Sequence, residues 1–358
     1  MKGKEAEVRI RSSGVITVAA LFLVCLPAAR QLLAGPILID WAYAGNPPQG
    51  VVGAEMTQYG GYVYGEGYYV GIQADGSLGP WLPTTDPAVG NQRLIGANGH
   101  IYSVGGSATG APGTSVLVST VQGDASLGSW SATSAMNVPR CDVGLALYGD
   151  YLYVVGGWSA NTVYERSVEY ALINPDGSLG PWTLASNWPA NRRVLSGLLA
   201  LDGYLYTIGG HRHEYLTATV ERAQIMGDGS LGLWEPQADL PLALGGGGAC
   251  EIMDVVFVVG GFTQPYGADF TDRVLYSSLQ ADHSLSSWSD TTPLLDDAVG
   301  VRMAFAYGNR IYVLGNEDVA IEIGTVHNVP EPATLTLVGS GCLAMAALRR
   351  RRRKTGTG

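Results

Sequence analysis

Asp75-Gly-Ser-Leu-Gly-Pro-Trp81 is the stretch that decides the fold, because the chain repeats it. The same seven residues return unchanged at Asp176 to Trp182, and variants stand at Asp124 to Trp130, Asp228 to Trp234 and Asp282 to Trp288. The five tryptophans are 49, 52, 52 and 54 residues apart. A period near 50 residues with strand-like content indicates an array of small β-sheets rather than one mixed core.

A second marker lies between the tryptophans: an apolar or aromatic segment that ends in a glycine pair. It occurs at Ile101 to Gly106, Leu152 to Gly157, Leu205 to Gly210 and Val256 to Gly261, and in degraded form at Ile311 to Asn316. Each unit therefore predicts four strands. Two are joined by a tight turn, the third follows the glycine pair, and a short fourth carries the tryptophan.

The two ends of the array complete each other. The last unit predicts strands at Gly300 to Tyr307, Ile311 to Leu314 and Val319 to Ile323, but it has no tryptophan strand. The segment Ile37 to Tyr43, centred on Trp41, supplies one. Because an open ring would leave two unpaired sheet edges, the sequence predicts an all-β, six-bladed β-propeller closed by the N-terminal strand.

These markers resemble the kelch-type β-propeller from Pro36 to Gly324. In that family the glycine pair ends the second strand and the later aromatic residue packs within the blade. The family also tends to have an arginine just before the first strand. Such arginines stand here at Arg93, Arg140, Arg192 and Arg302, whereas the fifth unit has Leu244 to Gly248.

The N-terminus has the pattern of a targeting segment. Lys2, Lys4, Arg9 and Arg11 precede an apolar run from Val15 to Leu26, and small residues follow. This order is typical of a secretory signal peptide. A retained membrane anchor is the alternative, although the run is short for a membrane span.

The C-terminus has three parts in a fixed order. A Pro-Glu-Pro motif comes first, at Val329, Pro330, Glu331 and Pro332. An apolar stretch from Thr334 to Leu348 follows, and a basic cluster begins with Arg349, Arg350 and Arg351. Fifteen helical residues rise about 22 Å, short of the ~30 Å hydrocarbon core, so the span is weak. A simple tail anchor is one reading, but the three parts together resemble the PEP-CTERM sorting signal, which implies an exosortase-type processing enzyme.

We therefore expect a signal helix over residues 1–34, the propeller over 35–324, and over 325–358 a linker and sorting signal with a transmembrane helix. The expected location is the cell envelope or extracellular space, with transient anchoring by the C-terminal segment. Gly35 to Pro330 has 10 basic and 28 acidic residues, a formal charge of −18, and no lysine. This surface repels nucleic acid and anionic lipid, so we expect neither as a partner.

Catalytic or metal chemistry has little support in the sequence. His211 and His213 would point the same way on a strand and could hold a metal, but no third ligand has suitable spacing. The Asp-Gly repeats lack the alternating acidic residues of a calcium loop, and turn chemistry accounts for them. Copper oxidases of the same propeller family need a Tyr and His set that five histidines do not supply. Kelch-like sialic acid mutarotases are a nearer comparison, without a shared motif. We expect no catalytic residue, cofactor or metal.

Two cysteines, Cys141 and Cys250, belong to the folded part. We place them on the first strands of the third and fifth blades. Alternate blades hold such strands farther apart than the ~7 Å that a disulfide can bridge. Both are therefore expected to be free thiols.

A ligand site is expected where loops vary between blades. Function tends to lie on variable loops carried by a rigid scaffold, and the second-to-third-strand loops differ most. Their candidate ligand residues are Trp158, His211, His213 and Tyr266. The expected function is a non-catalytic exported propeller that binds glycan, such as exopolysaccharide, or an envelope protein. The alternative is a carbohydrate-active enzyme such as a mutarotase or lyase.

Overall fold

The structure is a computed structural model that describes residues 36–48, 51, 56–107, 111–159, 163–185, 197–212, 215–264, 268–296, 301, 303–315 and 321–328. The chain divides into two compact units, of which Ile39–Val326 is one and the two terminal segments are the other. The expected signal helix and C-terminal transmembrane helix lie outside the described residues. Within the described part, no helix is long and apolar enough to cross a membrane.

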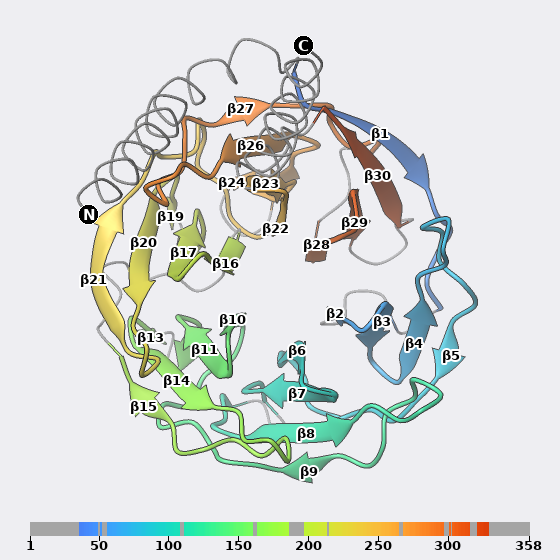
Figure 1. Ribbon diagram of the computed structural model, residues 1–358, viewed down its shortest axis with the longest axis vertical. Coiled ribbons are helices and arrows are strands. Elements are labelled where there is room, and N and C mark those ends of the chain that lie inside the picture. The colour runs from blue at the N-terminus through green and yellow to red at the C-terminus, as the bar shows by residue number, and fades with distance from the viewer. Residues whose placement is uncertain are drawn as a thin grey trace, which may run out of the picture. The chain divides into compact units, whose positions relative to one another are not determined.

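The unit Ile39–Val326 contains six antiparallel four-stranded sheets, set around a central axis as the sequence predicts (Figure 1). Blade 1 contains β2 (Met56–Tyr59), β3 (Tyr62–Gly65), β4 (Tyr68–Gly71) and β5 (Leu82–Pro83). Blade 2 contains β6 (Arg93–Ala97), β7 (His100–Val104), β8 (Val116–Thr120) and β9 (Ser131–Ala132). Blade 3 contains β10 (Gly144–Tyr148), β11 (Tyr151–Val155), β14 (Val168–Leu172) and β15 (Thr183–Leu184).

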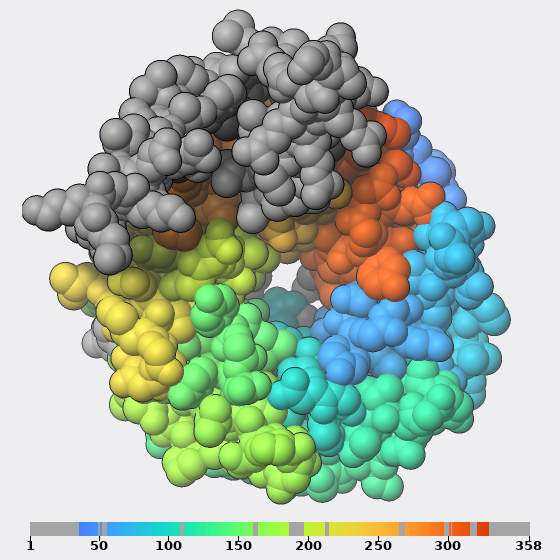
Figure 2. Space-filling model, in the orientation of Figure 1, coloured from blue at the N-terminus to red at the C-terminus, as the bar shows by residue number. Residues whose placement is uncertain are grey.

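The remaining blades repeat the same order. Blade 4 contains β16 (Gly197–Leu201), β17 (Tyr204–Ile208), β20 (Val220–Ile225) and β21 (Leu231–Pro236). Blade 5 contains β22 (Gly248–Ile252), β23 (Val255–Val259), β26 (Val274–Ser278) and β27 (Ser289–Asp290). Blade 6 contains β28 (Met303–Tyr307), β29 (Arg310–Leu314), β30 (Glu322–His327) and β1 (Leu38–Tyr43). The first strand of each blade is innermost, and the side chains drawn in colour leave an opening at the centre (Figure 2).

The N-terminal strand closes the ring, as predicted, because β1 is hydrogen-bonded to β30 in the sheet of blade 6. Trp41 on β1 donates its indole N–H to the Thr292 carbonyl of the preceding connection, at 3.1 Å. In blade 5, Trp288 donates in the same way to the Ala238 carbonyl, at 2.9 Å. Trp41 therefore occupies in blade 6 the place that the repeated tryptophan occupies in blade 5.

Strand boundaries in blades 3 and 6 differ from the sequence expectation. The third strand of blade 6 is Glu322–His327 rather than Val319 to Ile323. The first strand of blade 3 begins at Gly144, so Cys141 precedes it and forms only an isolated bridge with Trp158. Trp182 precedes β15 instead of lying on it. In each case a residue pairs or packs beyond the end of the regular strand ladder. The pattern of apolar residues alone does not distinguish such a residue from one inside the strand.

The repeated Asp-Gly-Ser turn joins the third and fourth strands and is held by its own side chains. Asp176 Oδ1 accepts hydrogen bonds from the backbone N–H and hydroxyl of Ser178, at 3.0 and 2.7 Å, and the other four copies have the same bonds. These bonds, the hydroxyl's first, lower the pKa of the Asp176 carboxyl. Gly177 has a φ of 83°, and a Cβ there would meet the His100 ring of the preceding blade at 2.4 Å. The repeats are structural turns, as predicted.

A tyrosine on the second strand fixes each of these turns to the preceding blade. In blade 3 the Tyr153 hydroxyl donates to the Gly229 carbonyl of the blade 4 turn, at 2.8 Å. Blades 1, 2, 4 and 6 make the same bond from Tyr64, Tyr102, Tyr206 and Tyr312. Blade 5 has Phe257 at this position. Its neighbour, blade 6, takes its fourth strand from the N-terminus and therefore has no Asp-Gly turn to receive a hydroxyl.

The two faces of the ring differ in their connections. We call the side with the first-to-second and third-to-fourth turns the turn face, and the opposite side, which includes the segments after the glycine pairs, the loop face. Apolar side chains fill the junctions between neighbouring blades, as in the cluster that joins Tyr102 and Val104 of blade 2 to Leu152 and Val154 of blade 3. This apolar packing fixes the blades and so positions the loop-face segments.

Candidate functional site

The residue after each glycine pair occupies one equivalent position on the loop face. It is Ser107 in blade 2, Trp158 in blade 3, His211 in blade 4 and Phe262 in blade 5. The backbone bridges Ser107 to Gly90, Trp158 to Cys141 and Phe262 to Gly245 establish the equivalence. Blades 3, 4 and 5 thus present three consecutive aromatic rings, which we call the aromatic arc.

Short hairpins carry the arc, where the sequence predicts only loops. They are β12 (Trp158–Ser159) with β13 (Val163–Tyr164), β18 (His211–Arg212) with β19 (Tyr215–Leu216), and β24 (Phe262–Gln264) with β25 (Ala268–Phe270). Blade 1 instead joins its second and third strands through the two residues Glu66 and Gly67. The loop face therefore carries hairpins over blades 3 to 5 and only a tight turn over blade 1.

Neighbouring contacts hold the rings of the arc in place. The His211 and Phe262 rings, from adjacent blades, lie edge to face with centroids 4.9 Å apart. The Trp158 indole N–H donates to Asp142 Oδ2 at 3.0 Å. On the hairpin that carries His211, Tyr215 of β19 is 72 % exposed, the most exposed aromatic side chain in the described part of the chain. Half-buried and exposed aromatic rings suit stacking against a sugar ring or an apolar partner surface.

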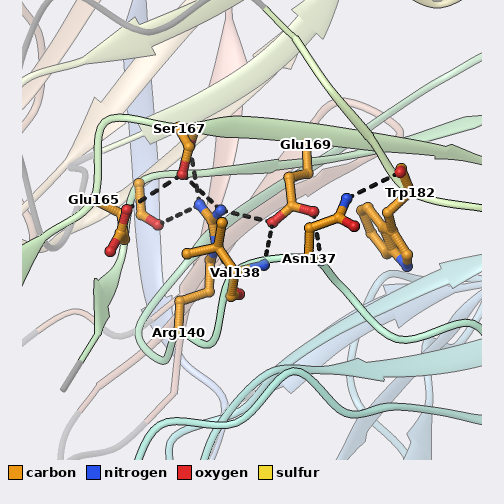
Figure 3. Close-up of polar contacts among 8 residues, drawn as sticks. Asn137, Val138, Arg140, Glu165, Ser167, Glu169 and Trp182 are labelled. Atoms are coloured by element: carbon orange, nitrogen blue, oxygen red, sulfur yellow. Dashed lines mark hydrogen bonds and ion pairs between the residues drawn. The ribbon is translucent and has the colours of Figure 1, made fainter.

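A buried arginine clamps the hairpin that bears Trp158 (Figure 3). Arg140 Nη1 donates to the carbonyls of Gly156 and Ser167, at 3.0 and 2.9 Å, and these two residues flank the β12–β13 hairpin. Arg140 Nη2 donates to the Ser167 hydroxyl and to Glu169 Oε1, both at 2.8 Å. One guanidinium therefore fixes both ends of the hairpin to the blade.

The charges of this clamp are fully enclosed. The side chains of Arg140 and Glu169 are both 0 % exposed. Burial lowers the pKa of the Arg140 guanidinium, and the Glu169 carboxylate opposes that change. Glu169 also accepts the backbone N–H groups of Asn137 and Val138, at 2.7 and 3.0 Å. A buried ion pair whose remaining polar groups are bonded meets the requirement for tolerating charge away from water.

The arginines named from the family tendency are not all equivalent. Arg140 lies four residues before β10, whereas Arg93 is the first residue of β6, so grouping the two was wrong. Arg192 and Arg302 lie outside the described residues. The residue equivalent to Arg140 in blade 5 is Leu244, because the Gly106 N–H bonds the Arg140 carbonyl as the Gly210 N–H bonds the Leu244 carbonyl.

Of the four candidate ligand residues, the structure places Trp158 and His211 at equivalent positions of blades 3 and 4. His213 and Tyr266 lie outside the described residues. Sequence reasoning missed the Arg140 clamp. It also did not foresee the contact between His211 and Phe262. A comparison of the units residue by residue could have found both, since each depends on equivalent positions in successive blades. No group of three or more His, Cys, Asp or Glu in the described ranges could hold a metal ion.

Cys141 and Cys250 are both buried and neither forms a disulfide, as expected. Cys141 lies beneath the arc, with its Sγ 3.8 Å from the Trp158 carbonyl oxygen. Cys250 lies on β22, and burial raises the pKa of its thiol well above the usual range. Neither thiol is poised as a nucleophile, because a reactive cysteine needs a lowered pKa and exposure.

Comparison with known proteins agrees with both the fold and the C-terminal motif. The model of the PEP-CTERM protein-sorting motif matches residues 328–353. Kelch-like protein 13 of Homo sapiens is 32 % identical over 92 residues, which are 26 % of this chain and 14 % of that protein. Kelch-like protein 23 of Mus musculus is 26 % identical over 184 residues, 51 % of this chain and 30 % of that protein. The chain thus spans less than a third of the length of either relative.

A solved structure titled "Structure of YjhT" superposes with a TM-score of 0.59 and 14 % identity, covering 78 % of this chain and 95 % of that one. At this identity the likeness concerns the fold alone. The sorting motif indicates an exported protein with a membrane-anchored signal of the kind that an exosortase recognises. The chain is therefore a six-bladed β-propeller that resembles kelch-type repeat proteins and carries a PEP-CTERM sorting motif at residues 328–353.

Proposed function

We propose that this protein is a non-catalytic binding propeller of the cell envelope or extracellular matrix, which holds a glycan such as exopolysaccharide through its loop face. The observation that carries the proposal is the aromatic arc of Trp158, His211 and Phe262, together with the exposed Tyr215 on the hairpin that carries His211. Aromatic faces bind sugar rings by stacking and bury apolar area at little cost in conformational entropy. An envelope protein with an apolar surface is the other partner that such an arc would accept.

The domain organisation that goes with this function has three parts. Residues 1–34 are the signal peptide, 35–324 the propeller, and 325–358 the linker and sorting signal. An exosortase-type enzyme removes the tail near Pro330, Glu331 and Pro332 and releases the propeller to its final location. Mass spectrometry of the natural product tests this step. Recovery of an intact Arg349, Arg350 and Arg351 would instead leave a membrane-anchored propeller.

The binding proposal is tested with the producer's own exopolysaccharide and the purified protein. We expect saturable binding without chemical change in the polysaccharide. Tyr215→Ala should weaken that binding several-fold, because loss of a stacking ring removes about 0.5–1.5 kcal/mol. Leu233→Ala is the matched control, since Leu233 is 86 % exposed on β21, a strand of the same blade outside the arc. Equal binding by wild type and Tyr215→Ala would refute the contribution of this exposed ring to binding.

The second candidate is a carbohydrate-active enzyme, such as a mutarotase or lyase. His211, which contacts Phe262 on the loop face, favours this reading over a fully inert surface. The same experiment decides between the two candidates when the incubated polysaccharide is followed by NMR. A change in anomeric composition, or the appearance of unsaturated ends, would assign catalysis. Unchanged spectra at full occupancy would leave a binding protein.

A further inference from the structure

Blade 2 presents buried polar groups where its neighbour has apolar ones. Gln92 is 2 % exposed and Ser103 is 1 % exposed. The equivalent residues of blade 3 are Val143 and Val154. The first equivalence follows from the bridges Gly90 to Ser107 and Cys141 to Trp158. The second follows from the pairing of Leu94 with Ser103 and of Leu145 with Val154.

These two polar residues face the junction of blades 1 and 2. Leu94, which pairs with Ser103 and lies two residues from Gln92, packs in a cluster with Tyr64 and Tyr69 of blade 1. Side chains of paired residues, and of residues two apart, lie on the same side of a sheet. At the junction of blades 2 and 3, by contrast, Val143 and Val154 complete the apolar cluster.

The oxygen atoms of this pair have no hydrogen-bond partner among the residues that the structure describes. Gln92 Oε1 and Ser103 Oγ are both buried and unbonded, and so is Ser107 Oγ, next to the second glycine of the same blade. Buried polar atoms are otherwise bonded in folded proteins, either to protein or to ordered water. Blade 2 holds three such oxygen atoms, and a bound hydroxyl group could supply the partner that the described residues do not provide.

We propose that Gln92 and Ser103 bind a hydroxyl group at the junction of blades 1 and 2. A hydroxyl is the group that matches both atoms, because it donates one hydrogen bond to Gln92 Oε1 and accepts one from the Ser103 hydroxyl. Water supplies this group. A sugar hydroxyl supplies it as well, and this second source rests on the proposed glycan binding. The site is linked to the arc because Ser107 of blade 2 occupies the position that Trp158 and Phe262 occupy in their blades.

Crystal structures of the wild-type protein and of Gln92→Val/Ser103→Val test the site directly. The double variant copies blade 3, where valine is buried at both equivalent positions. We expect one oxygen within about 2.5–3.0 Å of both Gln92 Oε1 and Ser103 Oγ in the wild type, and none in the variant. Empty density between these two atoms in the wild type would overturn the proposal, whatever becomes of the variant.

Binding of a neutral oligosaccharide from the natural polymer distinguishes the two sources. A tenfold weaker affinity of the double variant, with the oxygen replaced by sugar density in soaked wild-type crystals, assigns the site to a sugar hydroxyl. Unchanged affinity, with the same single oxygen in soaked and unsoaked crystals, assigns it to water. Gln122→Val, at an exposed glutamine of blade 2, is the control and should alter neither result. If the wild-type protein bound no glycan at all, the proposed function would be refuted. The hydroxyl site would still be tested by the oxygen atom in the crystals of the wild-type protein.

Discussion

Replacing Arg140 with leucine should destabilise the propeller strongly, because it leaves a buried carboxylate without its cation. Arg140→Leu removes the bonds to Gly156, Ser167 and Glu169 while Glu169 stays 0 % exposed. Breaking one partner of such a pair costs about 3–5 kcal/mol. For a domain of this size the loss lowers Tm by about 6–20 °C, at roughly 2–4 °C per kcal/mol.

The fifth blade supplies the compensating substitutions. Leu244 stands in place of Arg140, and Leu275 stands in place of Glu169, since Val258 pairs with Leu275 as Val154 pairs with Glu169. Both leucines are buried in one apolar cluster. Arg140→Leu/Glu169→Leu should therefore recover part of the stability that Arg140→Leu loses, because it removes the unpaired charge.

A third substitution should add to the recovery. In the double variant the N–H groups of Asn137 and Val138 lose their acceptor, at about 1–3 kcal/mol for each buried group left unbonded. Blade 5 has Pro241 at the position of Asn137, and proline has no N–H. Asn137→Pro added to the double variant should bring Tm closer to that of the wild type.

Thermal melts and urea titrations followed by circular dichroism measure all four proteins. Arg273→Leu is the control, since it breaks the exposed pair Arg273–Asp290 and should cost only about 0–1 kcal/mol. The reasoning fails if Arg140→Leu melts within about 2 °C of the wild type. It also fails if the double variant melts no higher than Arg140→Leu.

Three further outcomes are expected. Removing Pro36 to Tyr43 should open blade 6 and lower Tm by many degrees, and an unchanged melt would contradict closure by β1. Tyr153→Phe should lower the free energy of unfolding by about 1 kcal/mol, because a buried carbonyl loses its donor. Phe257→Tyr should not raise it, since blade 6 offers no turn carbonyl to accept the new hydroxyl. Urea titrations of both variants measure the two free energies. Burial, and then the charge of Asp296, raise the pKa of Glu322. A raised carboxyl pKa stabilises the fold at low pH and loses that contribution as pH rises through the folded-state value. Glu322→Gln should therefore melt higher than the wild type at neutral pH, with a difference that vanishes near pH 4; a difference independent of pH would refute the assignment.

The six-bladed ring could be predicted from the sequence because the same markers recur in successive units. Trp41 lies outside the five regular units. Its place in the ring could still be predicted, because the last unit, at the other end of the chain, has no tryptophan strand of its own. The structure adds why the repeat must have this form: the second-strand tyrosine of one blade donates to the Asp-Gly turn of the next. Phe257, which breaks the tyrosine pattern, precedes the one blade that lacks the turn.

The site could be predicted only in part. The hairpins of the arc have strands of two or three residues, too short for an alternating pattern to reveal. Arg140 and Glu169 are 29 residues apart, so no local motif joins them. Arg93 resembled Arg140 in sequence, but Arg93 starts β6 whereas Arg140 lies four residues before β10, so the two residues hold different positions in their blades. The pair can be detected in the sequence only after the blades are aligned with one another. Blade 5 then has Leu244 at the position of Arg140 and Leu275 at the position of Glu169, so both charges are absent together.

The turn face and the loop face differ in whether their side chains already take part in contacts within the protein. On the turn face, Asp176 bonds Ser178, and the Tyr102 hydroxyl bonds the Gly177 carbonyl within the same turn. Burial raises the pKa of Tyr102 to about 12, so this hydroxyl keeps its proton at any physiological pH. A ligand that took these groups would have to break contacts between blades. On the loop face Tyr215 is 72 % exposed and can stack on a ligand without breaking such a contact. Substitutions on the turn face should therefore lower stability first, whereas Tyr215→Ala should lower binding while leaving Tm unchanged.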